Sequence, residues 1–205
     1  MTSRRIPRYV AGLLVSCLVL TGCQPDDSKN TSPLPTASVT GKVVCGFASQ
    51  ESFVTALGTS DFSLNGSMPD LRGSKNPDGS KLSQAGCSAF TKDAPLEALK
   101  ISVRLLNAAD RWDAVVPSKL AAGGLDFVFP TDEGLGFATA GKNADDDAAQ
   151  AHLIVGDWHY FVSIHPHVKG RDAVQDAVAL IRQTVTQLNL PKTGKLPRPT
   201  ATPSS

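Results

Sequence analysis

Apolar and polar residues alternate along the middle of the chain in the manner of β-strands. In the clearest case, every second residue from Leu99 to Leu105 is Leu, Ile or Val, and the residues between them are Lys, Ser and Arg. Because side chains of a strand point alternately to its two faces, this pattern predicts a strand with one buried face. Less regular runs predict further strands at 61–68, 87–91, 125–129, 136–140, 151–155 and 159–165.

The last two of these strands form a predicted hairpin. Its two-residue turn is either 156–157 or 157–158, and both alternatives give the same assignment of faces. The expected core face carries five large side chains: Leu153, Val155, Tyr160, Val162 and Ile164.

Two other stretches have the period of a helix. Residues 49–57 predict a short helix that ends at Gly58. Residues 171–188 predict a long amphipathic helix with one apolar side, which Pro191 ends. Residues 110–120 are ambiguous, because Pro117 limits any helix there.

These elements predict a single α+β domain over residues 41–190. We expect a mostly antiparallel sheet, with the short N-terminal helix and the long C-terminal helix covering one of its faces. Residues 23–40 and 191–205 are rich in Pro, Ser and Thr and poor in apolar residues. Such segments bury too little surface to fold, so we expect a disordered tether before the domain and a disordered tail after it.

Charge excludes one class of partner. The chain has 20 Lys and Arg against 19 Asp and Glu, and its basic residues do not form a block. Proteins that bind nucleic acid usually carry a basic patch or stripe. We therefore expect no nucleic-acid partner.

The N-terminus predicts export. Three arginines precede an apolar run over 10–20, which is too short to span a bilayer and is typical of a secretory signal peptide over 1–22. The run ends in Leu20-Thr21-Gly22-Cys23, which resembles the lipobox of bacterial lipoproteins. The resemblance implies cleavage between Gly22 and Cys23 and a lipid on the Cys23 thiol, which would anchor the chain to the cell membrane. Arg4-Arg5 leaves twin-arginine export open as the alternative to the general secretory route.

Two cysteines remain for the domain, since Cys17 lies in the apolar run and Cys23 is the expected lipid carrier. Disulfides persist outside the cytoplasm, so we expect a Cys45–Cys87 disulfide. The alternatives are two free thiols or half of a metal site. The absence of a C-x-x-C pair speaks against the metal site.

The histidines offer a second candidate site. All four lie between His152 and His167, and imidazole is a ligand for Zn²⁺ or Cu²⁺. On the predicted hairpin, His152, His165 and His167 can approach one another, whereas His159 is too far along the strand to join them. The alternative is that these side chains are simply polar residues on the other face of the sheet.

Taken together, the chain resembles a family of actinobacterial extracytoplasmic lipoproteins whose domain has no assigned function. The shared features are the lipobox, the Pro/Ser/Thr tether, Cys45-Gly46 before a short helix ending at Gly58, Cys87 in a strand, and a Gly156-Asp157 hairpin before the final helix. Phe90 lies three positions after Cys87, further than the aromatic residue that commonly follows this cysteine in the family. The resemblance implies a location and a scaffold, but no reaction and no cofactor.

The sequence therefore predicts a lipid-anchored binding or accessory module at the cell envelope, acting on an envelope protein or a small ligand. It has no G-x-S-x-G, S-x-x-K or H-E-x-x-H motif, which favours a protein without enzymatic activity. Two alternatives stay open. One is an enzyme whose site is assembled only in the fold, and the other is a metal or small-ligand carrier that uses the three histidines.

Overall fold

The structure is a computed structural model that describes residues 32–36, 40–67, 71, 82–94, 96–107, 110, 112–130, 134–141, 148–165 and 168–191. The predicted signal peptide, Cys23 and nearly all of the predicted tail lie outside the described residues.

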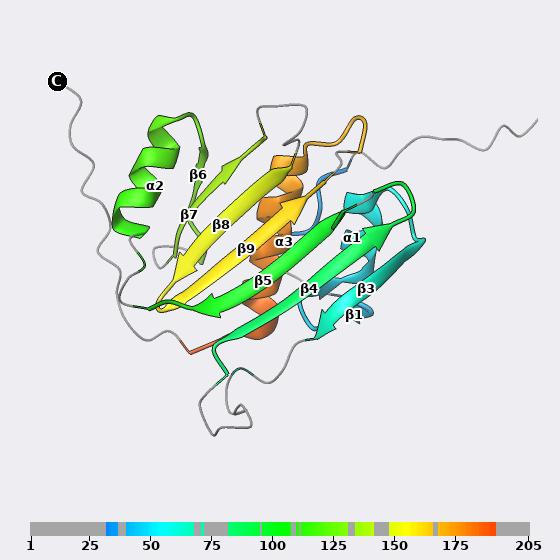
Figure 1. Cartoon of the computed structure of the whole chain (residues 1–205), viewed down its shortest axis with the longest axis horizontal. Helices are drawn as coiled ribbons and strands as arrows, with labels where there is room; N and C mark the ends of the chain where they lie inside the picture. Colours follow the sequence, from blue (N-terminus) through cyan, green and yellow to red (C-terminus); the bar gives the residue numbers. More distant parts are fainter. Residues whose placement is uncertain are drawn as a thin grey trace, which may run out of the picture.

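Seven antiparallel strands form the main sheet, in the order β3-β4-β5-β9-β8-β7-β6 (Figure 1). The strands are β3 (Phe62–Ser67), β4 (Gln84–Thr91), β5 (Leu99–Leu105), β6 (Leu125–Phe127), β7 (Gly134–Thr139), β8 (Ala149–Val155) and β9 (Trp158–Ile164). A separate two-stranded sheet pairs β1 (Val43–Val44) with β2 (Ala48–Ser49). The helices are α1 (Gln50–Leu57), α2 (Trp112–Ala121) and α3 (Ala173–Leu188). The predicted α+β fold is confirmed.

The main core lies between one face of the sheet and α3, beside which α1 packs. The hairpin turn is 156–157, because Val155 pairs with Trp158. All five side chains assigned to the core face of this hairpin are buried, as the alternation predicts. In Figure 1, α3 crosses behind the middle of the sheet.

Both helices of this layer begin and end at residues suited to those positions. The Asp172 side chain caps α3 by accepting hydrogen bonds from the backbone N–H groups of Val174 and Gln175. Ser49 caps α1 in the same way, and Gly58 ends it at φ 67°. Glycine adopts this left-handed conformation without strain.

Helix α2 is an addition to the predicted layer, since it lies on the opposite face of the sheet from α1 and α3. Val116 of α2 packs on Phe137 and Ile154 in a second, smaller core. The side chains of Leu153 and Ile154 point to opposite faces, and they belong to the first and second core respectively. The prediction that the N-terminal and C-terminal helices cover one face is confirmed for α1 and α3, and α2 forms in the region that the sequence left ambiguous. Pro117 lies inside this helix.

Residues 32–36, here called the strap, lie against α3 instead of leaving the domain as a tether. Leu34 is buried in the main core. The Pro35 carbonyl accepts a hydrogen bond of 2.6 Å from Gln183 Nε2, and the Ser32 carbonyl accepts one of 3.1 Å from Arg171. The described part of the segment expected to be free therefore belongs to the folded domain.

Candidate functional site

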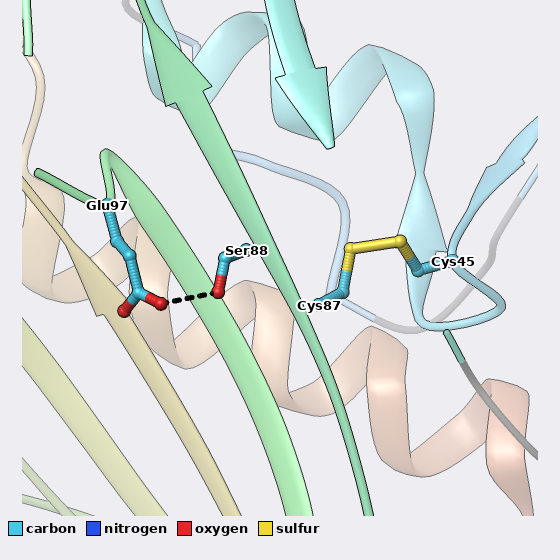
Figure 2. Close-up of a disulfide and its surroundings, with 4 residues drawn as sticks. All are labelled: Cys45, Cys87, Ser88 and Glu97. Atoms are coloured by element: carbon cyan, nitrogen blue, oxygen red, sulfur yellow. Dashed lines mark hydrogen bonds between the residues drawn. A yellow bond between two sulfur atoms is a disulfide. The ribbon is translucent and has the colours of Figure 1, made fainter. Parts of the chain in front are cut away.

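The predicted disulfide is present. Cys45 and Cys87 are joined with their Cα atoms 6.1 Å apart, which connects the β1–β2 turn to β4. Figure 2 shows Cys87 pointing toward Cys45, while the adjacent Ser88 points to the other side of the strand and donates a hydrogen bond of 2.7 Å to Glu97. The bond leaves neither thiol available for catalysis or metal binding.

A cavity of about 300 Å³ lies under the C-terminal end of α3. We call it the α3 cavity. Its walls come from the segment after β6, from the β8–β9 hairpin and from the last turn of α3 with the residues that follow. The lining residues are Phe129, Pro130, Val155, Tyr160, Val185, Thr186, Asn189 and Leu190. Most of these side chains are apolar, and the volume lies at the lower end of the range found for small-molecule sites.

Tyr160 is the buried polar group on the wall of the α3 cavity. Only 2% of this residue is exposed, and its hydroxyl forms no hydrogen bond with any other described residue. Burial raises the pKa of Tyr160 above its ordinary value. The hydroxyl therefore stays protonated at neutral pH and can donate a hydrogen bond to a molecule in the cavity.

Arg182 is not a lining residue, but it lies one turn before Thr186 on α3 and near the lining residue Phe129. Its guanidinium carbon is 5.9 Å from the ring centre of Phe127 and 5.8 Å from that of Phe129, which also lines the cavity. Both distances are within the range of a cation–π interaction. The guanidinium has no ion pair or hydrogen bond to another described residue, and its Nε atom is shut off from solvent.

Strand geometry holds the Phe127 ring at this position. Phe127 of β6 pairs with Gly136 of β7, and a Cβ atom on Gly136 would come within 2.7 Å of the Phe127 ring. The ring thus occupies the space that a side chain at 136 would fill. The absence of that side chain lets the ring lie flat against β7, next to α3 and Arg182.

A buried histidine pair occupies the opposite face of the sheet. His152 Nδ1 and His159 Nε2 are 3.1 Å apart, so one ring donates a hydrogen bond to the other. Burial lowers the pKa of His152 to about 4 and that of His159 to about 3. Both rings are consequently neutral at pH 7.

Aromatic rings surround this pair. Trp112 of α2 lies 4.3 Å from His159 between ring centres, and Phe137 stacks on His152 at 4.7 Å. Phe161 lies 4.8 Å from His152. These contacts make the two histidines part of the second core beneath α2.

An ion pair lies next to the histidines. Arg104 donates two hydrogen bonds, of 2.9 and 2.7 Å, to the Asp110 carboxylate. These bonds and one from the Asn107 backbone N–H hold the pKa of Asp110 at about 2. Asp110 is therefore a fixed anion that orients Arg104.

The three histidines proposed as metal ligands are only partly covered by the structure. His152 pairs with Phe161 across the strands and contacts His159, whereas His165 lies four residues beyond Phe161, or about 13 Å along the strand. His167 lies outside the described residues. No group of three or more His, Cys, Asp or Glu suited to a metal occurs in the described part of the chain. The three-histidine site stays a prediction, and the observed contact of His152 with His159 is one that sequence reasoning did not predict, because it considered only the distance of His159 from His165.

Sequence reasoning also missed the α3 cavity. A tyrosine on the predicted core face among Leu, Val and Ile was an available signal, because a buried hydroxyl needs a partner. Arg182 gave no such signal, since the sequence assigned it to the solvent side of the last helix.

Comparisons of the chain with known protein families, with curated proteins and with solved structures give no match. None of the helices within the described residues has the length and apolar character to cross a membrane.

Proposed function

We propose that this protein is a lipid-anchored extracytoplasmic lipoprotein whose domain binds a small, mainly apolar ligand in the α3 cavity. The observation that carries the binding function is the cavity itself, which combines an apolar wall with a Tyr160 hydroxyl that has no hydrogen-bond partner among the described residues. Ligand sites commonly have this composition, an apolar lining with a few polar groups that orient the ligand.

The lining favours binding over catalysis. The described lining residues include no carboxylate, imidazole, amine or thiol. General-base and nucleophilic catalysis ordinarily depend on these groups. A hydroxyl held in its protonated form suits recognition, and we therefore propose a carrier or accessory role at the cell envelope.

Binding in the cavity can be tested with the neutral fluorescent probe N-phenyl-1-naphthylamine. We expect saturable binding to the wild-type protein and at least a tenfold loss in Thr186→Trp, because the larger ring enters the cavity from an exposed rim position. Gln187→Trp is the matched control, since it adds the same ring on the exposed side of α3. Val185→Trp fills the cavity from its wall and gives a second test. Equal probe binding by all four proteins would overturn the proposed site.

The anchor is tested separately in cells. We expect Cys23→Ala to move the protein out of the membrane fraction and globomycin to cause accumulation of the uncleaved precursor. Cys17→Ala, which changes a cysteine inside the signal run, should leave both membrane association and processing unchanged. Membrane retention of Cys23→Ala would show that the anchor lies elsewhere.

A further inference from the structure

Resting on the proposed binding function, we propose that the ligand of the α3 cavity is a small amphipathic acid. Its apolar body of about ten carbons would lie in the cavity. Its carboxylate would accept hydrogen bonds from the Arg182 guanidinium and the Tyr160 hydroxyl.

The charge of Arg182 is the first argument. An arginine stays protonated at every pH that a folded protein tolerates, and burying part of a charge without an anion is costly. Arg182 lies within cation–π distance of two phenylalanine rings and has no anionic partner among the described residues. The rings hold the guanidinium beside the cavity without neutralising it. A ligand carboxylate would supply the missing negative charge and the acceptors for its N–H groups.

Tyr160 gives an independent argument for an acceptor group on the ligand. Tyr160 is a buried residue on the cavity wall, its hydroxyl has no hydrogen-bond partner among the described residues, and this hydroxyl is protonated at neutral pH, as tyrosine ordinarily is. A buried donor that lacks an acceptor is uncommon in a folded protein. A ligand oxygen in the cavity would accept its hydrogen bond.

The described lining also favours an anionic over a cationic ligand. Its residues contain no carboxylate that would neutralise an ammonium group, and Arg182 would repel such a group. An uncharged ligand would fill the cavity but leave Arg182 unpaired. The wall therefore selects an acid.

Cavity volume limits the size of the apolar part. A volume of about 300 Å³ holds on the order of ten water-sized groups, at about 30 Å³ each. A chain of roughly ten carbons fits this space, whereas the acyl chains of membrane lipids are longer. Decanoate is thus a suitable probe, with decanol and decyltrimethylammonium as neutral and cationic probes of equal chain length.

The experiment is titration calorimetry of the full mature chain with these three probes at pH 7, below their micelle concentrations. We expect decanoate to bind at least tenfold more tightly than decanol, and decyltrimethylammonium to bind most weakly. A tenfold ratio corresponds to about 1.4 kcal/mol, which is less than a typical charge-assisted hydrogen bond contributes.

Substitutions test whether Arg182 causes the preference for decanoate over decanol. Arg182→Met keeps an unbranched apolar stem between the phenylalanine rings and removes the charge, so decanoate should lose its advantage over decanol. Arg182→Lys should retain part of the preference, and Tyr160→Phe should weaken decanoate binding several-fold. Lys169→Met, at an exposed position before α3, removes one positive charge elsewhere and should have no effect.

The outcomes separate the two proposals. If decanol binds as tightly as decanoate and Thr186→Trp abolishes this binding, the cavity is a ligand site. The proposal that its ligand is an acid would then be overturned. An unchanged preference for decanoate in Arg182→Met would also overturn it. Failure of all three probes and of the naphthylamine to bind would overturn the proposed function itself.

Discussion

The neutral state of His152 and His159 makes the second core sensitive to acid. Both rings are buried, and their pKa values of about 4 and about 3 lie below the value of about 6.5 for an unfolded chain. The unfolded protein therefore binds more protons than the folded protein at any pH between these limits. Stability from this pair is complete above pH 6.5 and is lost as the pH falls toward 3.

We predict that the free energy of unfolding falls between pH 6.5 and pH 4, by up to about 1.4 kcal/mol per pH unit for each histidine. Urea unfolding at several pH values measures this slope. His159→Phe removes one titrating ring and should flatten the slope, whatever its effect on stability at pH 7. A slope that is the same in both proteins would contradict the prediction.

Arg171 and Asp176 form the most buried ion pair among the described residues. Their side chains are 3% and 5% exposed, and two hydrogen bonds of 2.7 and 2.6 Å join them. Arg171 also donates to the Ser32 carbonyl, so the pair orients the strap on α3.

Asp176→Asn removes the carboxylate charge from a pair whose side chains are almost fully buried, and we predict a loss of about 3–5 kcal/mol in unfolding free energy. The matched control is Lys100→Met, which breaks a pair whose side chains are 41% and 39% exposed. Because solvent screens that pair, its loss should cost at most about 1 kcal/mol. Similar effects of the two substitutions in urea unfolding would contradict the assigned role.

Among the helices and strands, the sequence best predicts those that bury one regular face in the main core. The alternation at Leu99–Leu105 and the apolar side of α3 both face this core, and both elements were predicted closely. Helix α2 was left ambiguous for two reasons. Pro117 is a local signal against a helix, and the packing of Val116 on the second face depends on strands distant in sequence.

The α3 cavity could not be predicted for a related reason. Its wall combines Phe129, Tyr160 and Leu190 from three separate segments. Periodicity assigns each segment a buried face, but it does not show where opposing side chains fail to fill the space between them. Only their arrangement in space shows that no described residue hydrogen-bonds to the Tyr160 hydroxyl.

The packing of Phe127 of β6 on Gly136 of β7 can be tested by a substitution at Gly136. Gly136→Ala would place a Cβ atom 2.7 Å from the Phe127 ring and force the ring to move. We expect a loss of about 1–3 kcal/mol in stability, as for other overpacked sites, and weaker decanoate binding because Arg182 rests on that ring.

Gly86→Ala is the control for this substitution. A Cβ atom on Gly86 would meet no atom closer than 3.5 Å, although this glycine also lies in a strand of the same sheet. It should leave both stability and binding near the wild-type values. Wild-type binding by a folded Gly136→Ala protein would show that Phe127 does not position Arg182.

For the whole molecule, the strap changes the boundary of the folded domain. The sequence places that boundary at residue 41, because the preceding residues are mostly polar or proline. Leu34 is an apolar residue within this segment, and the core in which it is buried includes residues of α3, near the other end of the chain. Composition averaged over the segment does not show the contribution of one buried leucine.

We predict that Leu34→Ala lowers the free energy of unfolding by about 2 kcal/mol, at the lower end of the range for buried leucines because the strap can move to close the space. Pro33→Ala, at an exposed position of the strap, should change it by less than about 0.5 kcal/mol. Denaturant unfolding of both variants provides the measurement. An effect of Leu34→Ala no larger than that of Pro33→Ala would show that the strap does not stabilise the domain.

The strap also limits how far a lipid-anchored form of the protein could extend. Ser32 is fixed to Arg171, just before α3, and only nine residue steps separate it from Cys23. At about 3.4 Å per residue these steps span at most about 31 Å, whereas a tether ending at residue 41 would span about 61 Å. The α3 cavity lies at the other end of a 16-residue helix, about 24 Å away. An envelope protein that exchanges ligand with this cavity would therefore have to act within roughly 55 Å of the lipidated residue.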